Sequence, residues 1–386
     1  MASYTRTPYL VVSRETAARK DVYGSIDDHV VLQAQLLRGE EPSDTAVVAM
    51  HPIGAPGYLP AFSQLARAGM HVVACSTRYS TGDAPLQLEN CLLDVAACIR
   101  DARERLGYKR VVLAGWSGGG SLMAGYQGQV EKRTITRTGA GEPTPLADAD
   151  LLPADGLMLL AAHRSRHHLL TDFLDASVLD EDDPEARDPE LDLYGGTIEP
   201  PYDADFLHAY RAAQVARSAR ITARAQQRLA DLAIAGRPHD EHCFLVQGTM
   251  ADPRWLDPTV DPNDRRPGWS YLGDPRTANT GPAGLARFTT ARSWLSQWSL
   301  ETAQVDAVEA CSRLSIPLLV VVNSADDAVP TSHAQAYLDA VPHEDKELHT
   351  IQGATHYYAG PGQREHLERA AEIVVDWAAS HDLVQA

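Results

Sequence analysis

Long apolar runs are missing from this sequence. No stretch approaches the roughly 20 residues that a membrane-spanning helix needs, and the mean hydropathy is −0.27. The opening residues, MASYTR, also lack the basic start, apolar middle and small-residue cleavage site of a secretory signal. We therefore expect a cytoplasmic protein that does not associate with membranes.

Cysteine and positive charge are also scarce. The five cysteines are scattered and form no CxxC pair, which fits reduced thiols better than a disulfide framework. Lysine and arginine number 34 against 52 aspartate and glutamate residues, so the formal net charge is −18. Such a surface repels nucleic acid and anionic membranes. We expect neither as a partner, and a homo-oligomer is left open.

The 386 residues, of which 44% are hydrophobic, suffice for one large domain or two ordinary ones. Over the first 160 residues, short apolar runs alternate with amphipathic helical patterns. The predicted strands are 30–37, 46–50, 71–76, 110–114 and 156–162, and the predicted helices are 59–68, 86–106 and one that ends near residue 130. This alternation predicts an α/β fold with a mostly parallel, doubly wound sheet.

The alternation stops at residue 163 and resumes after residue 294. The stretch between contains an acidic loop, a long helical pattern over 204–235 and a loop rich in proline, aspartate and glycine. Because structureless loops beyond about 15 residues are uncommon in compact domains, we expect residues 163–294 to form a mainly helical inserted cap. Residues 1–162 and 295–386 would form the core, with later strands at 317–322 and 347–351 and helices at 335–341 and 364–380.

A glycine-rich turn joins the predicted strand at 110–114 to the next helix. It reads Gly115-Trp116-Ser117-Gly118-Gly119, which matches G-x-S-x-G in the strand–turn–helix context that gives this pattern its meaning. Glycines on both sides of the serine let the strand and the helix approach closely, so the hydroxyl projects above the sheet near the positive end of a helix dipole. No lysine follows at the position that a phosphate-binding loop requires. We predict that Ser117 is a nucleophile.

A serine hydroxyl needs a base that takes its proton, and the base needs an orienting acid. In this architecture both follow the serine, the acid first. His356 lies in a loop directly after the last predicted strand and is the predicted base. Asp326 and Asp327 follow the strand at 317–322, and we favour Asp326 as the acid, with Asp327 as a solvated charge or a helix cap. Asp172, beyond the strand at 156–162, is the remaining candidate.

Acyl transfer also needs N–H donors directed at the developing oxyanion. One is expected from Gly118, the residue after the nucleophile, and the other from the loop His51-Pro52-Ile53-Gly54 after the strand at 46–50. Pro52 has no N–H, so Ile53 is the preferred donor and Gly54 the alternative. We expect His51 to support this loop by hydrogen bonding.

Four segments, in this order, resemble the α/β-hydrolase superfamily over about 30–162 and 316–379. They are AVVAMHPIG, VVLAGWSGGG, LLVVVNSADDAVP and IQGATHYY. The resemblance aligns Asp326 with the acid-bearing turn and His356 with the terminal G-x-x-H of the family. Pro52 and Asn323 depart from it, since the family usually has glycine at both positions. The resemblance implies an α/β-hydrolase fold and a serine hydrolase without a cofactor.

The substrate expected from this pattern is a small or medium apolar or aromatic carboxylic ester, cleaved through an acyl-enzyme. Thioesterase, lactonase, C–C bond hydrolase and acyltransferase activities are alternatives within the same chemistry. A ligand-binding protein that keeps the fold without turnover is the alternative from another class.

Two features of the predicted cap bear on ligands. His163, His167 and His168 cluster at its start, but no acidic or cysteine ligand accompanies them at a metal-binding spacing, so we expect no metal. If Arg164 and Arg166 face the pocket, a substrate with a single carboxylate remains an alternative. The cap's aromatic residues would line an apolar pocket or form the cap's own core: Trp255, Trp269, Tyr271, Phe288, Trp294 and Trp298.

Overall fold

The centre of the molecule is an eight-stranded sheet with the strand order β1-β2-β4-β3-β5-β6-β9-β10. The structure is a computed structural model that describes residues 3–15, 20, 22 and 28–384. β2 (His29–Arg38) pairs antiparallel with β1 (Thr5–Arg14) and with β4 (Val72–Ser76). The other neighbours pair in parallel, which confirms the mostly parallel sheet predicted from the sequence: β3 (Thr45–His51), β5 (Arg110–Trp116), β6 (Gly156–Leu160), β9 (Leu318–Ala325) and β10 (Lys346–Thr355).

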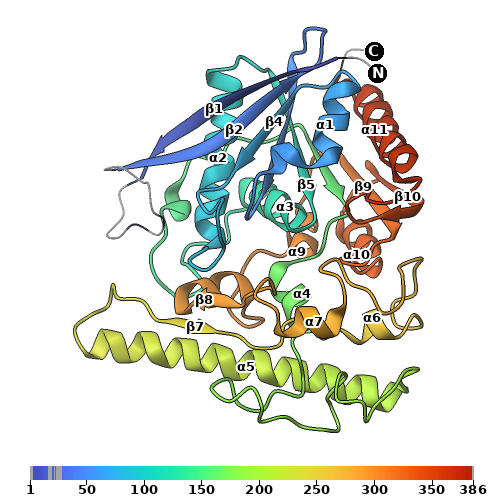
Figure 1. The fold of residues 1–386 in the computed structure, drawn as a ribbon. Coiled ribbons are helices and arrows are strands. Elements are labelled where there is room, and N and C mark those ends of the chain that lie inside the picture. The colour runs from blue at the N-terminus through green and yellow to red at the C-terminus, as the bar shows by residue number, and fades with distance from the viewer. Residues whose placement is uncertain (1–2, 16–19, 21, 23–27, 385–386) are drawn as a thin grey trace.

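Helices cover both faces of this sheet (Figure 1). One apolar cluster includes α2 (Leu88–Glu104), α3 (Gly118–Glu131) and α10 (Ser332–Ala340), and the other includes α1 (Pro60–Arg67) and α11 (Gln363–Ser380). Neighbouring residues of β5 face opposite clusters, since Val111 belongs to the first and Val112 to the second. Burial on both faces explains why the central strands are continuous apolar runs in the sequence.

The sequence pattern did not predict β1. In this strand Val11 is the one buried residue, and its neighbours are exposed or half-buried. The strand therefore has little apolar periodicity to detect. It also contains Pro8, which is tolerated because β1 is at the edge of the sheet.

The chain leaves the sheet after β6, and residues 163–306, which we call the insertion, form a layer on one side of it (Figure 1). The long helix α5 (Ala204–Ile234) lies on the side of this layer away from the sheet. The chain then passes through α9 (Ala307–Cys311), which packs against α3, and enters β9. The insertion also contains α4 (Arg166–Phe173), α6 (Pro253–Leu256), α7 (Pro275–Thr280), α8 (Ala291–Ser293) and a π-helical turn, η3 (Trp294–Trp298).

The insertion has an apolar core of its own. Leu170 of α4, Ile221 of α5 and both tryptophans of η3 belong to one buried cluster. Two three-residue strands, β7 (Cys243–Leu245) and β8 (Phe288–Thr290), pair antiparallel at its side. Strands this short have no readable periodicity, so the sequence did not predict them.

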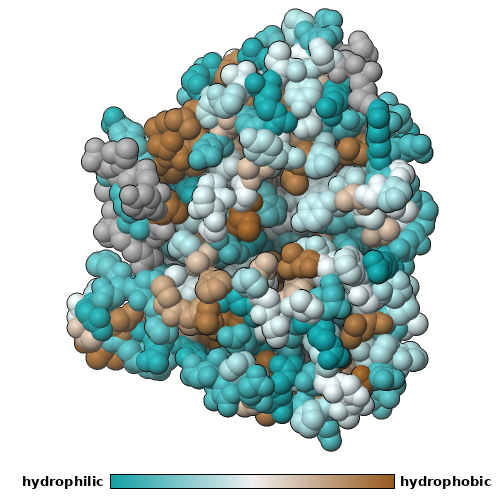
Figure 2. Space-filling model, viewed as in Figure 1, coloured by the Kyte–Doolittle hydropathy of each residue, from teal (hydrophilic) through white to brown (hydrophobic). Residues whose placement is uncertain are grey.

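Apolar side chains are scattered over the face seen in Figure 2, which is mostly hydrophilic. None of the helices in the described part of the chain is both long and apolar enough to cross a membrane.

The turn between β5 and α3 depends on close backbone packing. A Cβ added at Gly115 would lie 2.4 Å from the Gly119 oxygen and 2.4 Å from the Gly120 Cα. We expect Gly115→Ala to lower the free energy of unfolding by about 1–3 kcal/mol, the usual cost of overpacking. Gly82→Ala is the matched control, because a Cβ there meets nothing within 4 Å. Urea denaturation followed by circular dichroism measures both variants, and equal stabilities would contradict this interpretation.

Candidate active site

Ser117 lies at the tight turn between β5 and α3, with φ 51° and ψ −121°. A backbone conformation of this kind costs a residue with a side chain about 1–3 kcal/mol. Two hydrogen bonds hold the turn: the Ser117 N–H donates to the Leu160 carbonyl at 3.1 Å, and the Ser117 carbonyl accepts from the Gly120 N–H at 3.0 Å. Strain that the surrounding structure maintains in this way is common at functional positions.

Asp326 and His356 form a buried pair at the ends of β9 and β10. His356 Nδ1 lies 2.8 Å from Asp326 Oδ2, and the two residues are 1% and 2% exposed. Asp326 Oδ1 accepts from the N–H groups of Ala328 and Val329 at 2.8 and 2.7 Å, which fixes the carboxylate. The pair sets the tautomer with the proton on Nδ1. His356 Nε2 is buried without a hydrogen-bond partner among the described residues, so it is available to a hydroxyl group.

Side chains of the insertion hold the turn that carries Asp326. The backbone carbonyls of residues 326, 327 and 328 accept from Asn263 Nδ2 at 2.8 Å, Trp255 Nε1 at 2.7 Å and Arg254 Nη2 at 3.0 Å. Arg254 is itself fixed by the buried Asp252, 2.9 Å away. The insertion therefore helps to hold the turn that positions the Asp326 carboxylate.

The other two candidate acids have different surroundings. Burial and the charge of Asp326 raise the pKa of Asp327 to about 6, and no ion pair joins Asp327 to His356 in the described part of the chain. Asp172 lies in α4 and pairs with Arg211 at 3.4 Å. Of the three carboxylates, the structure places Asp326 against the imidazole.

A cavity of about 370 Å³ lies between the core and the insertion, and Ser117 and His356 are both in its wall. This volume is in the range of pockets that bind small molecules. Apolar side chains dominate the remaining wall, and the insertion contributes a large share of it: Leu169, Tyr271, Leu272, Ala283, Leu285 and Trp298.

The aromatic residues of the insertion take both expected roles, and two of them take neither. Tyr271 and Trp298 line the cavity, although Trp298 also belongs to the insertion's core cluster with Trp294. Trp255 packs with Phe173 at a ring-centroid distance of 4.6 Å. Trp269 and Phe288 are exposed.

Of the two expected oxyanion donors, Gly118 follows Ser117 in the chain and Ile53 lies in the same cavity wall. Gly118 is the first residue of α3, where no helical carbonyl can accept its N–H. Ile53 lines the cavity, and its carbonyl lies 2.7 Å from His51 Nδ1. The Ile53 N–H is 3.3 Å from the same nitrogen. Because an Nδ1–H that donates to the carbonyl cannot also accept, the shorter contact leaves the Ile53 N–H available.

His163, in the segment that follows β6, was not expected at this site. It lines the cavity, and its Nε2 and the His51 Nε2 lie 3.2 and 2.9 Å from the position of a Cβ at Gly118, so both imidazoles approach the same glycine. Burial, and then the charge of Arg166, lower the pKa of His51 to about 4 and that of His163 below its ordinary value. Both rings are therefore neutral near pH 7. The one sequence signal for His163 was its position after a predicted parallel strand, because ligand-binding sites lie at the carboxyl ends of such strands.

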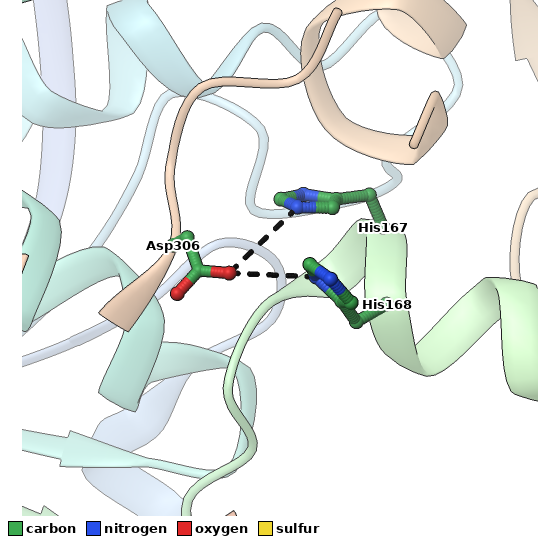
Figure 3. Close-up of side chains that lie close together, drawn as sticks. All are labelled: His167, His168 and Asp306. Atoms are coloured by element: carbon green, nitrogen blue, oxygen red, sulfur yellow. Dashed lines mark ion pairs between the residues drawn. The ribbon is translucent and has the colours of Figure 1, made fainter. Parts of the chain in front are cut away.

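His167 and His168 converge on Asp306, as Figure 3 shows, and His163 is not part of this cluster. Their nearest nitrogens are 4.0 and 3.4 Å from Asp306 Oδ2. The sequence did not link this acid to them, because more than a hundred residues separate them in the chain. Arg164 Nε donates to the same oxygen at 2.7 Å. A guanidinium thus already neutralises the carboxylate, and we interpret the cluster as a charged link between α4 and the segment before α9.

The Asp326–His356 pair can be tested without a substrate. A buried imidazole N–H that donates to a carboxylate exchanges slowly and resonates far downfield in proton NMR. We expect this resonance in the wild type and in Asp327→Asn, and its loss or marked upfield shift in Asp326→Asn, whose amide is a weaker acceptor. An unchanged resonance in Asp326→Asn would show that another group holds His356.

No protein-family model matches this sequence, and no curated protein matches it at a significant level. Solved structures do match. The siderophore hydrolase EstB from Aspergillus fumigatus is 15% identical, with a TM-score of 0.53 over 92% of this chain and 95% of that chain. A structure of DcsB in complex with its substrate analogue is 11% identical, with a TM-score of 0.52 over 98% of this chain and 99% of that chain.

At sequence identities this low, the matches show a shared fold and nothing more. Both matches extend over nearly the whole length of the two chains compared. The strand order of the sheet and the turn that places Ser117 between a strand and a helix agree with these matches. The protein has the α/β-hydrolase fold.

Proposed function

We propose that this protein is a serine hydrolase that cleaves carboxylic esters through an acyl-enzyme intermediate. The observation that carries the proposal is the Asp326–His356 pair. His356 Nε2 has no hydrogen-bond partner within the described ranges, and His356 shares one cavity wall with the strained Ser117. A nucleophile, a base and an orienting acid in this arrangement are the machinery of acyl transfer. The fold is also that of a structure named as a siderophore hydrolase, which is consistent with the proposal.

In the proposed reaction, Ser117 Oγ attacks the ester carbonyl while His356 Nε2 takes its proton. Asp326 stabilises the resulting imidazolium through Nδ1–H. The N–H groups of Ile53 and Gly118 bind the tetrahedral oxyanion. His356 then returns the proton to the leaving alcohol, and a water molecule, activated by the same base, releases the acid from Ser117.

The proposed substrate is a small or medium ester with an apolar or aromatic acyl group. The cavity volume and its leucine, alanine and aromatic lining support this size and polarity. Thioesters, lactones and C–C bonds activated by a carbonyl group use the same machinery and are the alternatives. The alternative from another class is a ligand-binding protein of the same fold. The available His356 Nε2 argues against it, because a binding protein has no need of a base in the same cavity wall as a serine.

Ser117 is the first residue to test. We expect Ser117→Ala to lower kcat on p-nitrophenyl butyrate by roughly 10⁴-fold or more, because triad members act as a unit, and to keep its melting temperature. Ser312→Ala, an exposed serine at the end of α9, should retain full activity. A fluorophosphonate should add its mass to the wild type and to Ser312→Ala but not to Ser117→Ala. Labelling elsewhere, or activity in Ser117→Ala, would contradict the assignment.

The shape and charge of the site predict which esters are cleaved. We expect good hydrolysis of p-nitrophenyl butyrate, poor hydrolysis of butyryl-CoA and no activation by emulsified long-chain triglyceride. The pocket is bounded by the insertion, and the net charge of −18 repels a polyanion such as CoA. Steady-state kcat/KM values for the three substrates decide the matter. A preference for the triglyceride or the CoA ester would overturn this substrate class while leaving the Ser117 chemistry in place.

A further inference from the structure

Arg166, the first residue of α4, lies in the wall of the same cavity and is only 4% exposed. A guanidinium buried this deeply is costly unless its N–H groups find acceptors. Nε donates to Gln297 Oε1 at 2.7 Å, and Nη2 donates to Asp83 Oδ2 at 2.8 Å. Nη1 donates to no residue that the structure describes. A charged donor left without an acceptor in a cavity wall points to a ligand.

The guanidinium is held rigidly. Its Cζ lies 4.1 Å from the ring centroid of Trp298, which stacks beneath it. The Gln297 amide nitrogen donates to the Asp83 carbonyl at 3.0 Å and to Ser293 Oγ at 2.7 Å, which turns its oxygen toward Arg166. A donor fixed in this way loses little entropy when a ligand binds.

The charge around Arg166 favours an uncharged acceptor. Asp83 forms an ion pair with the guanidinium, so the two charges cancel. The nearby His51 and His163 are neutral, because burial lowers their pKa values. The other charges that act on the cavity wall include the carboxylates of Asp326, behind His356, and Asp327, and both are negative. A carboxylate would therefore lose its hydration without meeting net positive charge, whereas a carbonyl oxygen would gain the Nη1 hydrogen bond at a smaller desolvation cost.

We propose that Arg166 selects the substrate: its Nη1 N–H binds an uncharged carbonyl oxygen that the ester carries in addition to the one under attack. The substrate class is then an ester with a second keto or amide carbonyl. This inference rests on the proposed function. Arg166 acts in recognition, and Ser117 and His356 act on the scissile bond.

Two matched ester series test the proposal. In the first, p-nitrophenyl heptanoate is compared with its 4-oxo, 5-oxo and 6-oxo analogues, and with the p-nitrophenyl monoesters of succinic, glutaric and adipic acid, which place a carboxylate at the same carbons. In the second, heptyl butyrate is compared with butyrates of the corresponding oxo alcohols. We expect at least one oxo ester to exceed its plain parent in kcat/KM by roughly tenfold or more, since hydrogen bonds to charged groups are the strong ones, and to exceed the matching carboxylate.

Arg166→Met should abolish this preference, so that the ratio of kcat/KM for the oxo ester to kcat/KM for plain heptanoate falls to about one. Arg164→Met is the matched control, because Arg164 pairs with Asp306 and is not among the residues that line the cavity. It should keep the preference. Asp83→Asn removes the compensating charge, so it should raise kcat/KM for the carboxylate esters relative to the oxo esters.

The outcomes separate the two proposals. If the wild type cleaves heptanoate but prefers no oxo ester, or prefers the carboxylate, the inference about Arg166 is wrong and the hydrolase assignment stands. The same holds if Arg166→Met and Arg164→Met keep equal preferences. If the wild type cleaves none of these esters, the proposed function fails first. If Arg166→Met does not fold, two measurements still test the inference. They are the wild-type preference for an oxo ester and the change in relative kcat/KM of carboxylate and oxo esters in Asp83→Asn.

Discussion

The strained backbone at Ser117 is the constraint on which the other features of this site depend. A positive φ at a serine persists only where the neighbouring structure imposes it, and here β5, β6 and α3 all contribute. An added Cβ at Gly119 would lie 2.4 Å from the Met50 oxygen, and one at Gly120 would lie 2.3 Å from the Ala162 Cβ. Because Gly119 and Gly120 have no side chains, α3 can begin directly above the strands. The result is a hydroxyl presented at the carboxyl edge of a parallel sheet, where ligands bind in open α/β folds.

That edge also brings the proposed partners of Ser117 together. Asp326 follows β9 and His356 follows β10, and the two strands are parallel neighbours, so residues just beyond their ends meet. The insertion contributes more than a cover. Asn263, Trp255 and Arg254 hold three consecutive carbonyls of the acid-bearing turn. A change in the insertion would therefore alter the geometry of the Asp326 carboxylate as well as the shape of the pocket.

Burial makes each charge at this site depend on a partner. Asp326 is stabilised by one imidazole and two backbone N–H groups, and Arg166 is balanced by Asp83. The two imidazoles beside Gly118 are kept neutral. Most of the cavity wall is apolar, and its polar groups lie at a few defined points. An apolar wall gives a pocket affinity, and a few fixed polar groups give it selectivity.

The sequence by itself determined the fold class, because continuous apolar strands, amphipathic helices and the G-W-S-G-G turn are local patterns. The same patterns named Ser117, Asp326 and His356 as candidates, and the structure places Asp326 against His356 and both Ser117 and His356 in one cavity. The edge strand β1 and the short β7–β8 pair have too little periodicity to be predicted. The sequence favoured Asp326 over Asp327, but only the tertiary structure placed Asp326 against His356, joined His167 and His168 to Asp306 without His163, and put Arg166 beside Asp83. These pairings join residues from distant parts of the chain, so no local pattern specifies them.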